Sequence, residues 1–187
     1  MEQKFYTVTV YSENQVGLLN QISIIFTRRK LNIESLTVSA SSLPGVHKFT
    51  ITTMADSEEM MIKLVKQIER KVDVMKAFYY TDDEIIFQEV ALYKMDTKCL
   101  LDNTEIEKMV RRYNAIIMEI NRDFTVIEKA GLPEEIQKLF NELNATGGLL
   151  QFVRSGRIAI TKSPMERVST FIKEQEERLK EMNITNN

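Results

Sequence analysis

The order of the predicted elements constrains the fold of this chain more than any single residue does. Alternating Thr and Val residues between positions 5 and 11 predict a strand, and further strands are predicted at 33–40, 47–54 and 72–80. Between them lie two stretches with apolar residues at helical spacing: Leu18, Leu19, Ile22, Ile25 and Phe26 in the first, and Met61, Leu64, Val65 and Ile68 in the second. The order strand-helix-strand-strand-helix-strand predicts an antiparallel four-stranded sheet with both helices on one face, the ferredoxin-like arrangement.

The same order begins again after the acidic break Asp82-Asp83-Glu84. Strands are predicted at 85–95, 115–120, 125–128 and 149–153, and helices at 104–113 and 133–143. The repeat is one of architecture and not of residue identity. We therefore expect an α+β protein made of two ferredoxin-like βαββαβ units in tandem, residues 1–81 and 84–187, the second followed by a strand at 158–161 and a C-terminal helix.

That C-terminal helix is predicted to start at Ser163-Pro164 and to lie outside the repeat. Its far end, residues 173–180, is nearly all charged. Such a charged segment is typical of a solvated helix end, and it is also compatible with a helix that docks on a partner. The sequence leaves both interpretations open.

Charge and rare residues exclude several classes of function. The chain has 187 residues with 25 Lys and Arg against 27 Asp and Glu, and no stretch concentrates enough basic charge to grip a phosphate backbone, which argues against nucleic acid as a partner. One cysteine, Cys99, excludes a disulfide framework, and any histidine-dependent site must use His47. Neither an apolar leader nor a run of about 18 apolar residues is present, so we expect a cytoplasmic chain without a membrane partner.

The ferredoxin-like fold itself names no function, because it carries enzymes, RNA binders, metal carriers and ligand sensors. An RNA-binding sheet needs a Gly-Phe-Gly-Phe-like element, which does not accompany Tyr6 and Tyr11. A metal carrier needs Cys-x-x-Cys after the first strand, where residues 12–17 read Ser-Glu-Asn-Gln-Val-Gly. We find no acid–base pair, so we predict no catalytic and no metal-binding residues and disfavour an autonomous small enzyme.

One region has the chemistry of a ligand site. The loop that ends at Gly17 leads into the first helix, whose free N–H groups and positive dipole end suit a carboxylate, and Asn32 follows the same helix. Asn14 and Asn32 would then hold the charged ends of an amino acid, with Leu18, Leu19 and Ile33 as an apolar wall. The alternative is that Asn14 caps the helix and Asn32 is a turn residue. The residues alone favour neither interpretation.

A longer motif in this region resembles a segment of a known protein family. Residues 28–38, Arg-Arg-Lys-Leu-Asn-Ile-Glu-Ser-Leu-Thr-Val, resemble the segment at the end of the first helix in the small regulatory subunits of acetolactate (acetohydroxyacid) synthase. These proteins consist of an ACT domain followed by a second α+β domain. Weaker matches support the resemblance over residues 1 to 163: Asn14-x-x-Gly17-x-Leu19, Val72-Asp73-Val74, Glu89 to Met95, and Arg154-Ser155-Gly156.

The resemblance implies a function in branched-chain amino acid biosynthesis. ACT domains of this family pair edge to edge into a homodimer, and a branched-chain amino acid, usually valine, sits between the first-helix loop of one chain and the Asn-bearing turn of its mate. The positions that correspond here, and that we predict to bind the effector, are Asn14, Gly17, Leu18, Leu19, Asn32 and Ile33.

The resemblance also implies a partner, the large catalytic subunit of acetolactate synthase, which the regulatory subunit activates and subjects to feedback inhibition. Thiamine diphosphate, FAD and magnesium belong to that subunit, so no cofactor is expected in this chain. The family commonly has a small residue after the loop glycine, whereas Leu18 follows Gly17 here, which leaves open which amino acid binds. The alternative is a free-standing ACT-domain amino-acid sensor without an enzyme partner.

Overall fold

The computed structural model of the chain describes residues 3–164, 168 and 170–174. Its packing divides these residues into two units. The first unit contains the residues up to Ile86 together with those from Ala159 on, and the second contains Phe87–Ile158. The two units are described separately below.

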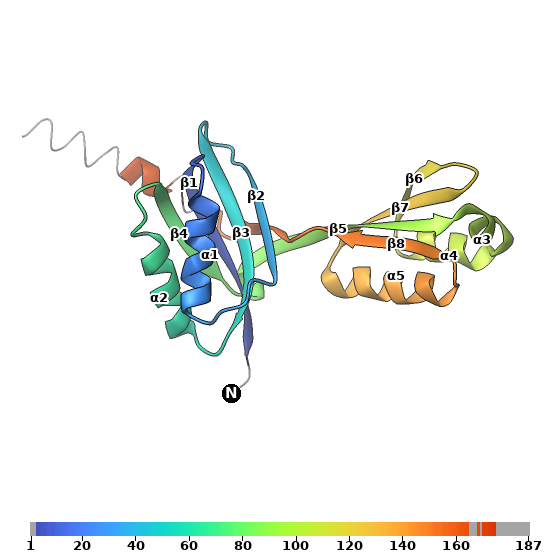
Figure 1. The fold of residues 1–187 in the computed structure, drawn as a ribbon, viewed down its shortest axis with the longest axis horizontal. Helices are drawn as coiled ribbons and strands as arrows, with labels where there is room; N and C mark the ends of the chain where they lie inside the picture. The colour runs from blue at the N-terminus through green and yellow to red at the C-terminus, as the bar shows by residue number, and fades with distance from the viewer. Residues whose placement is uncertain (1–2, 165–167, 169, 175–187) are drawn as a thin grey trace, which may run out of the picture. The chain divides into compact units, whose positions relative to one another are not determined.

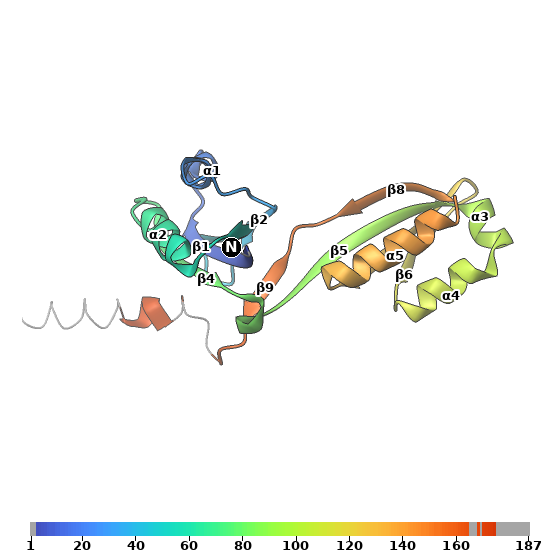
Figure 2. The same cartoon turned by 90° about the horizontal axis from the view of Figure 1, so that it is seen from below.

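The first unit has the predicted order of elements. These are β1 (Lys4–Glu13), α1 (Leu18–Arg28), β2 (Ser35–Ala40), β3 (Val46–Ala55), α2 (Glu58–Ile68) and β4 (Val74–Tyr80), followed by a 3-10 turn, η1 (Asp82–Glu84). The sheet order is β2-β3-β1-β4 with every pair antiparallel. Both helices lie on one face of this sheet (Figures 1 and 2), which confirms the ferredoxin-like prediction.

The central strand β1 explains why this unit is stable. Its alternation sends Tyr6, Val8 and Val10 to the helical face, where they join one core with the buried stripes of α1 and α2. The residues between them, Thr7 and Thr9, face the other way and are buried as well. The strand is therefore covered on both faces, and the second face needs a cover that the βαββαβ order does not supply.

The described C-terminal residues supply part of that cover. Val168 is buried in a small cluster with Tyr11 and Val46, and Ile172 packs against the same cluster. The described residues 168 and 170–174 are helical. The described residues from Ala159 on thus belong to the first unit, whereas the sequence predicts that they belong to the second. The predicted remainder of this helix, including its end at 175–180, lies outside the described residues.

The second unit repeats the strand order of the first. It contains β5 (Ile85–Asp96), α3 (Thr97–Asp102), α4 (Thr104–Arg112), β6 (Ile116–Ile120), β7 (Phe124–Gly131), α5 (Pro133–Ala145) and β8 (Leu149–Arg154), and β9 (Ile158–Thr161) pairs with β5. The order β6-β7-β5-β8 places the second, third, first and fourth strands exactly as β2-β3-β1-β4 does in the first unit. The tandem architecture is therefore confirmed.

Helix α3 was not predicted from the sequence. It starts directly after β5 because the side chain of Asp96 accepts hydrogen bonds from the N–H groups of Lys98 (2.7 Å) and Cys99 (3.1 Å). A Cβ atom at Gly148 would collide with Sγ of Cys99, so the close approach of α3 to the start of β8 requires glycine there.

A buried tyrosine organises the core of the second unit. Tyr93 on β5 is fully buried and donates a hydrogen bond to the carbonyl oxygen of Ile136 at 2.8 Å. Its ring lies 5.1 Å from the ring of Phe152, centroid to centroid. Burial raises the pKa of Tyr93 to about 12, so the hydroxyl stays protonated and keeps its role as a donor.

The edge strand β6 is unusual because all five of its residues are exposed. Four of the five are large and apolar: Ile116, Ile117, Met118 and Ile120. An exposed apolar edge strand is a template on which another strand can pair. In the described part of the chain, no helix has both the length and the apolar character needed to cross a membrane.

Leu64 tests the packing of the first unit. Its side chain is fully buried in α2, so we expect Leu64→Ala to lower the free energy of unfolding by about 2–5 kcal/mol. The matched control, Val72→Ala, changes a residue that is 98% exposed, and it should cost no more than about 0.5 kcal/mol. Urea denaturation followed by circular dichroism measures both. Equal stability of the two variants would contradict the assigned core.

Candidate functional site

The start of α1 has the open backbone that the sequence predicted. Gly17 precedes the helix with φ 86°, a left-handed conformation that favours glycine. A Cβ atom placed at Gly17 would meet no other atom within 4 Å, so the backbone here is open to an approaching molecule. No side chain of the described residues accepts a hydrogen bond from the first turn. Asn14 is exposed in the loop and does not cap α1, which removes one of the two interpretations of this residue.

Two backbone donors at this end remain available. The N–H of Leu18 donates to the carbonyl of Gln15 (3.3 Å), and the N–H of Gln21 donates to the carbonyl of Gly17 (3.1 Å). The N–H groups of Leu19 and Asn20 have no such partner among the described residues. Together with the positive end of the helix dipole, they form a site that suits a carboxylate.

At the opposite end of α1, the chain holds Asn32 in a fixed position. The Asn32 carbonyl accepts a hydrogen bond from Oγ1 of Thr53 at 2.6 Å, which fastens the turn to β3. Its side-chain amide is exposed and donates to Oε1 of Glu34 at 2.8 Å. The neighbouring Ile33 is half-buried against the core. The turn is therefore rigid, whereas the amide of Asn32 remains accessible.

The contacts of Arg29 indicate a structural role for part of the motif at residues 28–38. Its guanidinium donates to Oε1 of Gln67 (2.9 Å) and to the carbonyl of Lys63 (3.1 Å). Both partners belong to α2, so this arginine ties the end of α1 to the neighbouring helix. Its role is to position the turn that contains Asn32.

The predicted effector residues do not converge within one chain. Helix α1 has 11 residues and is therefore about 16 Å long, with Asn14 and Gly17 at one end and Asn32 and Ile33 at the other. Leu18 is only 1% exposed and packs in the core, whereas Leu19 is 45% exposed. Of the two leucines, Leu19 is the one that can contact a ligand directly.

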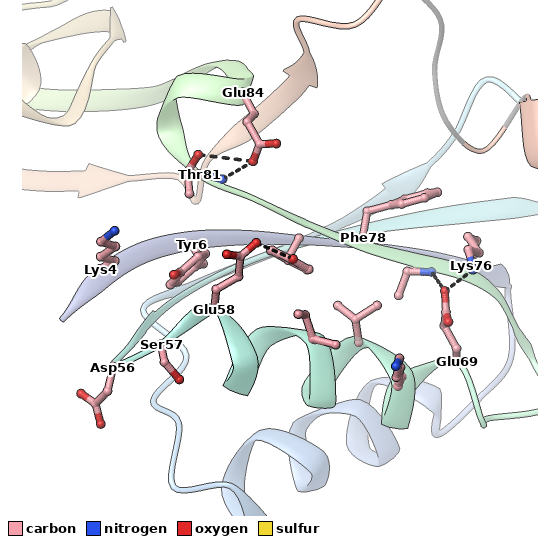
Figure 3. A pocket seen from close by; sticks show the side chains of 15 residues that line it. Lys4, Tyr6, Asp56, Ser57, Glu58, Glu69, Lys76, Phe78, Thr81 and Glu84 are labelled. Carbon is pink, nitrogen blue, oxygen red and sulfur yellow. Dashed lines mark hydrogen bonds and ion pairs between the residues drawn. The ribbon is translucent and has the colours of Figure 1, made fainter.

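The two edges of the first sheet differ in a way that bears on pairing. At β4, Oε1 of Glu69 accepts the N–H of Ala77 (3.3 Å) and pairs with Nζ of Lys76 (2.7 Å), so a side chain occupies this edge (Figure 3). At β2, no other described strand pairs with the outer side, and Val38 is 41% exposed. The edge at β2 is thus the one available to a further strand.

A cavity of about 610 Å³ lies between α2 and β4 (Figure 3). Within it, the hydroxyl of Tyr79 donates to Oε1 of Glu58 at 2.8 Å, and this hydrogen bond raises the pKa of Tyr79. Burial, and secondarily the charge of Glu58, raises the pKa of Tyr6 beside it. None of the predicted effector residues lines this cavity. Among the described residues, no group of three or more His, Cys, Asp or Glu is placed to hold a metal ion.

The family-like motifs of the second half meet at one junction. Oε2 of Glu89 pairs with Nη2 of Arg154 at 2.6 Å, with the glutamate largely buried. The hydroxyl of Ser155 accepts the N–H of Val90 (2.9 Å), and the N–H of Ser155 donates to the carbonyl of Val90 (2.8 Å). These motifs therefore join β5 to the end of β8, which is a structural role.

Both halves of the chain match models of known protein families. Residues 8–76 match the model of the AHAS small subunit-like ACT domain, and residues 88–163 match the model described as the small subunit of acetolactate synthase. The fold is also that of the acetolactate synthase small subunit of Thermotoga maritima, with a TM-score of 0.77 at 23% identity, covering 87% of this chain and 99% of that one.

Curated relatives agree over almost their whole length. The acetolactate synthase small subunit of Bacillus subtilis is 30% identical over 168 residues, which cover 90% of this chain and 95% of that protein. The probable acetolactate synthase small subunit of Methanothermobacter thermautotrophicus is 26% identical over 162 residues, 87% of this chain and 95% of that protein. The chain therefore belongs to the family of acetolactate synthase small subunits.

Proposed function

We propose that this chain is a non-catalytic regulatory subunit that binds a branched-chain amino acid and transmits its presence to the catalytic subunit of acetolactate synthase. The observation that carries the effector site is the uncapped start of α1 at Gly17, with its two unpaired N–H groups. The names of its relatives support the partner.

The topology indicates how two chains would complete the site. Strands β1 and β2 are both antiparallel to β3, so they run in the same direction and α1 returns between them. Helix α1 thus starts at the end of the sheet where β2 finishes, while Asn32 lies where β2 begins. A two-fold axis that pairs the β2 strands of two chains antiparallel makes the second chain run in the opposite direction along the shared sheet edge. The start of the mate's α1 then comes to the end of the sheet that holds Asn32.

The chemistry of the combined site fits an amino acid. The N–H groups of Leu19 and Asn20 would bind its carboxylate, and the amide oxygen of Asn32 from the other chain would accept from its ammonium group. Exposed Leu19 and half-buried Ile33 supply apolar surface for an aliphatic side chain. Asn14 lies in the same loop and adds an amide for either charged end.

Strand β6 favours a partnered protein over a free-standing sensor. Its exposed apolar residues lie in the second unit, far in sequence from the effector loop. A partner that covers an apolar strand edge removes it from water, which is a favourable contribution to association. A sensor that acts alone has no need of such an edge.

Reconstitution with the catalytic subunit of the same organism tests the proposal. We expect the two chains to copurify, and acetolactate formation to rise when this chain is added and to fall again with valine, leucine or isoleucine. Amino acid binding without copurification would favour the free-standing sensor. Acetolactate formation by this chain alone would contradict a non-catalytic role.

Val38→Lys tests dimerisation through β2. A lysine on an edge strand opposes pairing with another strand, so we expect the variant to sediment as a monomer at micromolar concentration, where the wild type is a dimer. Ile62→Lys is the control, because Ile62 is similarly exposed (38%) but lies on α2. A monomeric wild type would contradict both the pairing and the shared site.

Gly17→Asp tests the carboxylate site. The new carboxylate would repel that of the ligand at the start of α1, so we expect amino acid affinity to fall by about tenfold or more in calorimetry. Gly17→Asn is the matched control, since it has nearly the same shape and the same backbone strain at φ 86° without the charge. If both variants lost the same affinity, strain and not charge would be the cause.

Asn32→Ala tests the second half of the site. We expect the half-inhibitory concentration of the effector to rise by roughly five- to 150-fold while activation of the catalytic subunit persists. Glu34→Ala serves as the control, because it removes the partner of the Asn32 amide but keeps the amide itself. Loss of activation by Asn32→Ala at an unchanged melting temperature would instead assign Asn32 to the interface with the catalytic subunit.

A further inference from the structure

We propose that the first unit binds a small organic anion with more than one negative charge in a cavity between α1 and α2. The cavity has a volume of about 330 Å³, which lies in the range of small-molecule sites in proteins. Helix α1 contributes one part of its wall, and the end of α2 with the turn after it contributes the other. None of the predicted effector residues lines this cavity, so its test is independent of the amino acid site proposed above.

The lining contains three cationic side chains and no carboxylate. The cations are Arg28, which is the last residue of α1, and Arg70 and Lys71, which follow α2. They come from two segments that are far apart in the sequence, and only the packing of α2 beside α1 brings them to one cavity. The cavity of Figure 3 differs because four acidic residues line it.

The absence of acidic partners is the observation that points to a ligand. None of the three cations forms an ion pair with another described residue, whereas Lys63 of α2 pairs with Glu59 at 2.6 Å. Helix α1 contains no acidic residue at all, and the carboxylate of Glu69, beside Arg70 in the sequence, pairs with Lys76 instead. Like charges around one cavity repel one another, and a bound anion would remove that repulsion.

Gln67 adds a donor that a neighbouring residue orients. Its Oε1 accepts a hydrogen bond from Nε of Arg29 at 2.9 Å, which leaves the NH2 group of the same amide for another acceptor. Arg29 is itself fixed by the carbonyl of Lys63 at 3.1 Å. Gln67 and Gln21 both line the cavity, so amide groups accompany the three cations there.

The turn that contains Arg70 and Lys71 is held by its backbone. The N–H of Lys71 donates to the carbonyl of Ile68 at 3.0 Å, and the carbonyl of Lys71 accepts from the N–H of Val74 at 3.1 Å. Arg28 belongs to the last turn of a helix that is packed in the core. The backbone at all three cations is therefore ordered before a ligand arrives, which reduces the ordering that binding requires.

The lining also indicates the chemical class of the ligand. Three cations suit a phosphate group or several carboxylates better than a single carboxylate, and each guanidinium can donate two parallel hydrogen bonds to one oxyanion. Ile24 lines the same cavity and is 40% exposed, so an inorganic ion would leave apolar surface in contact with water. A compound of a few carbons with a phosphate or several carboxylates matches these features.

Calorimetry on the full-length chain at constant ionic strength provides the test. The probes are 2-phosphoglycerate and citrate, and acetate is the singly charged reference. We expect saturable binding of at least one probe and none of acetate, and the probe that binds distinguishes a phosphate ligand from a carboxylate ligand. Absence of saturable binding for both probes would overturn the proposal.

Charge-removing variants locate the binding. We expect Arg28→Gln, Arg70→Gln and Lys71→Gln each to lower the affinity for the bound probe about tenfold at an unchanged melting temperature. Arg28→Lys keeps the charge and should retain most of the affinity.

Lys66→Gln is the matched control for Arg70→Gln. Lys66 is also exposed and lies one helical turn before Arg70, but it lines the cavity of Figure 3 and not this one. Its replacement removes the same charge and should change the affinity by no more than about twofold. Equal losses in Arg70→Gln and Lys66→Gln would mean that the anion responds to net charge alone. That result, or unchanged binding in all three cavity variants, would refute the site.

Discussion

The packing of α1 against its sheet is the interaction on which the rest of the first unit depends. Leu18, Ile22, Ile25 and Phe26 are buried in one core with residues of β1, β3 and α2, and each such side chain contributes on the order of 1.5–3 kcal/mol. The same packing fixes both ends of the helix. It holds Gly17 with its open N–H groups at one end of the sheet and, through Arg29, the Asn32 turn at the other. A loosely packed helix would position neither half of an effector site.

The two edges of the first sheet differ in their availability for strand pairing because of one glutamate. Glu69 occupies the N–H of Ala77 and the ammonium of Lys76, which leaves β4 a poor template for another strand. Strand β2 has no such protection. This asymmetry supports the proposed pairing through β2, in which a second chain would bring the start of its α1 to the Asn32 turn of the first. The effector site and the dimer are thus one hypothesis and not two.

On the opposite face of the first sheet, residues that are far apart in the sequence pack together. Thr7 and Thr9 lie on a strand buried on both sides, and part of the cover comes from residues after Ala159. The second unit contributes a different feature, an apolar edge strand at β6, while its family-like motifs serve to join β5 and β8 through Glu89 and Arg154. The first unit thus carries the proposed effector site, and the second carries the exposed apolar strand β6.

The sequence by itself determined the two βαββαβ units, because alternating and helical periodicities are local and survive without tertiary context. It also located the loop that ends at Gly17 and the turn that contains Asn32, since helix ends are marked by local residues. It missed α3, whose cap at Asp96 follows a strand without a break, and it placed the segment after Ala159 in the wrong unit. Only the tertiary structure decided that Leu18 belongs to the core, that Glu69 closes β4, and that Lys48 meets Ala159. Those contacts join residues up to 111 positions apart, and no local pattern records them.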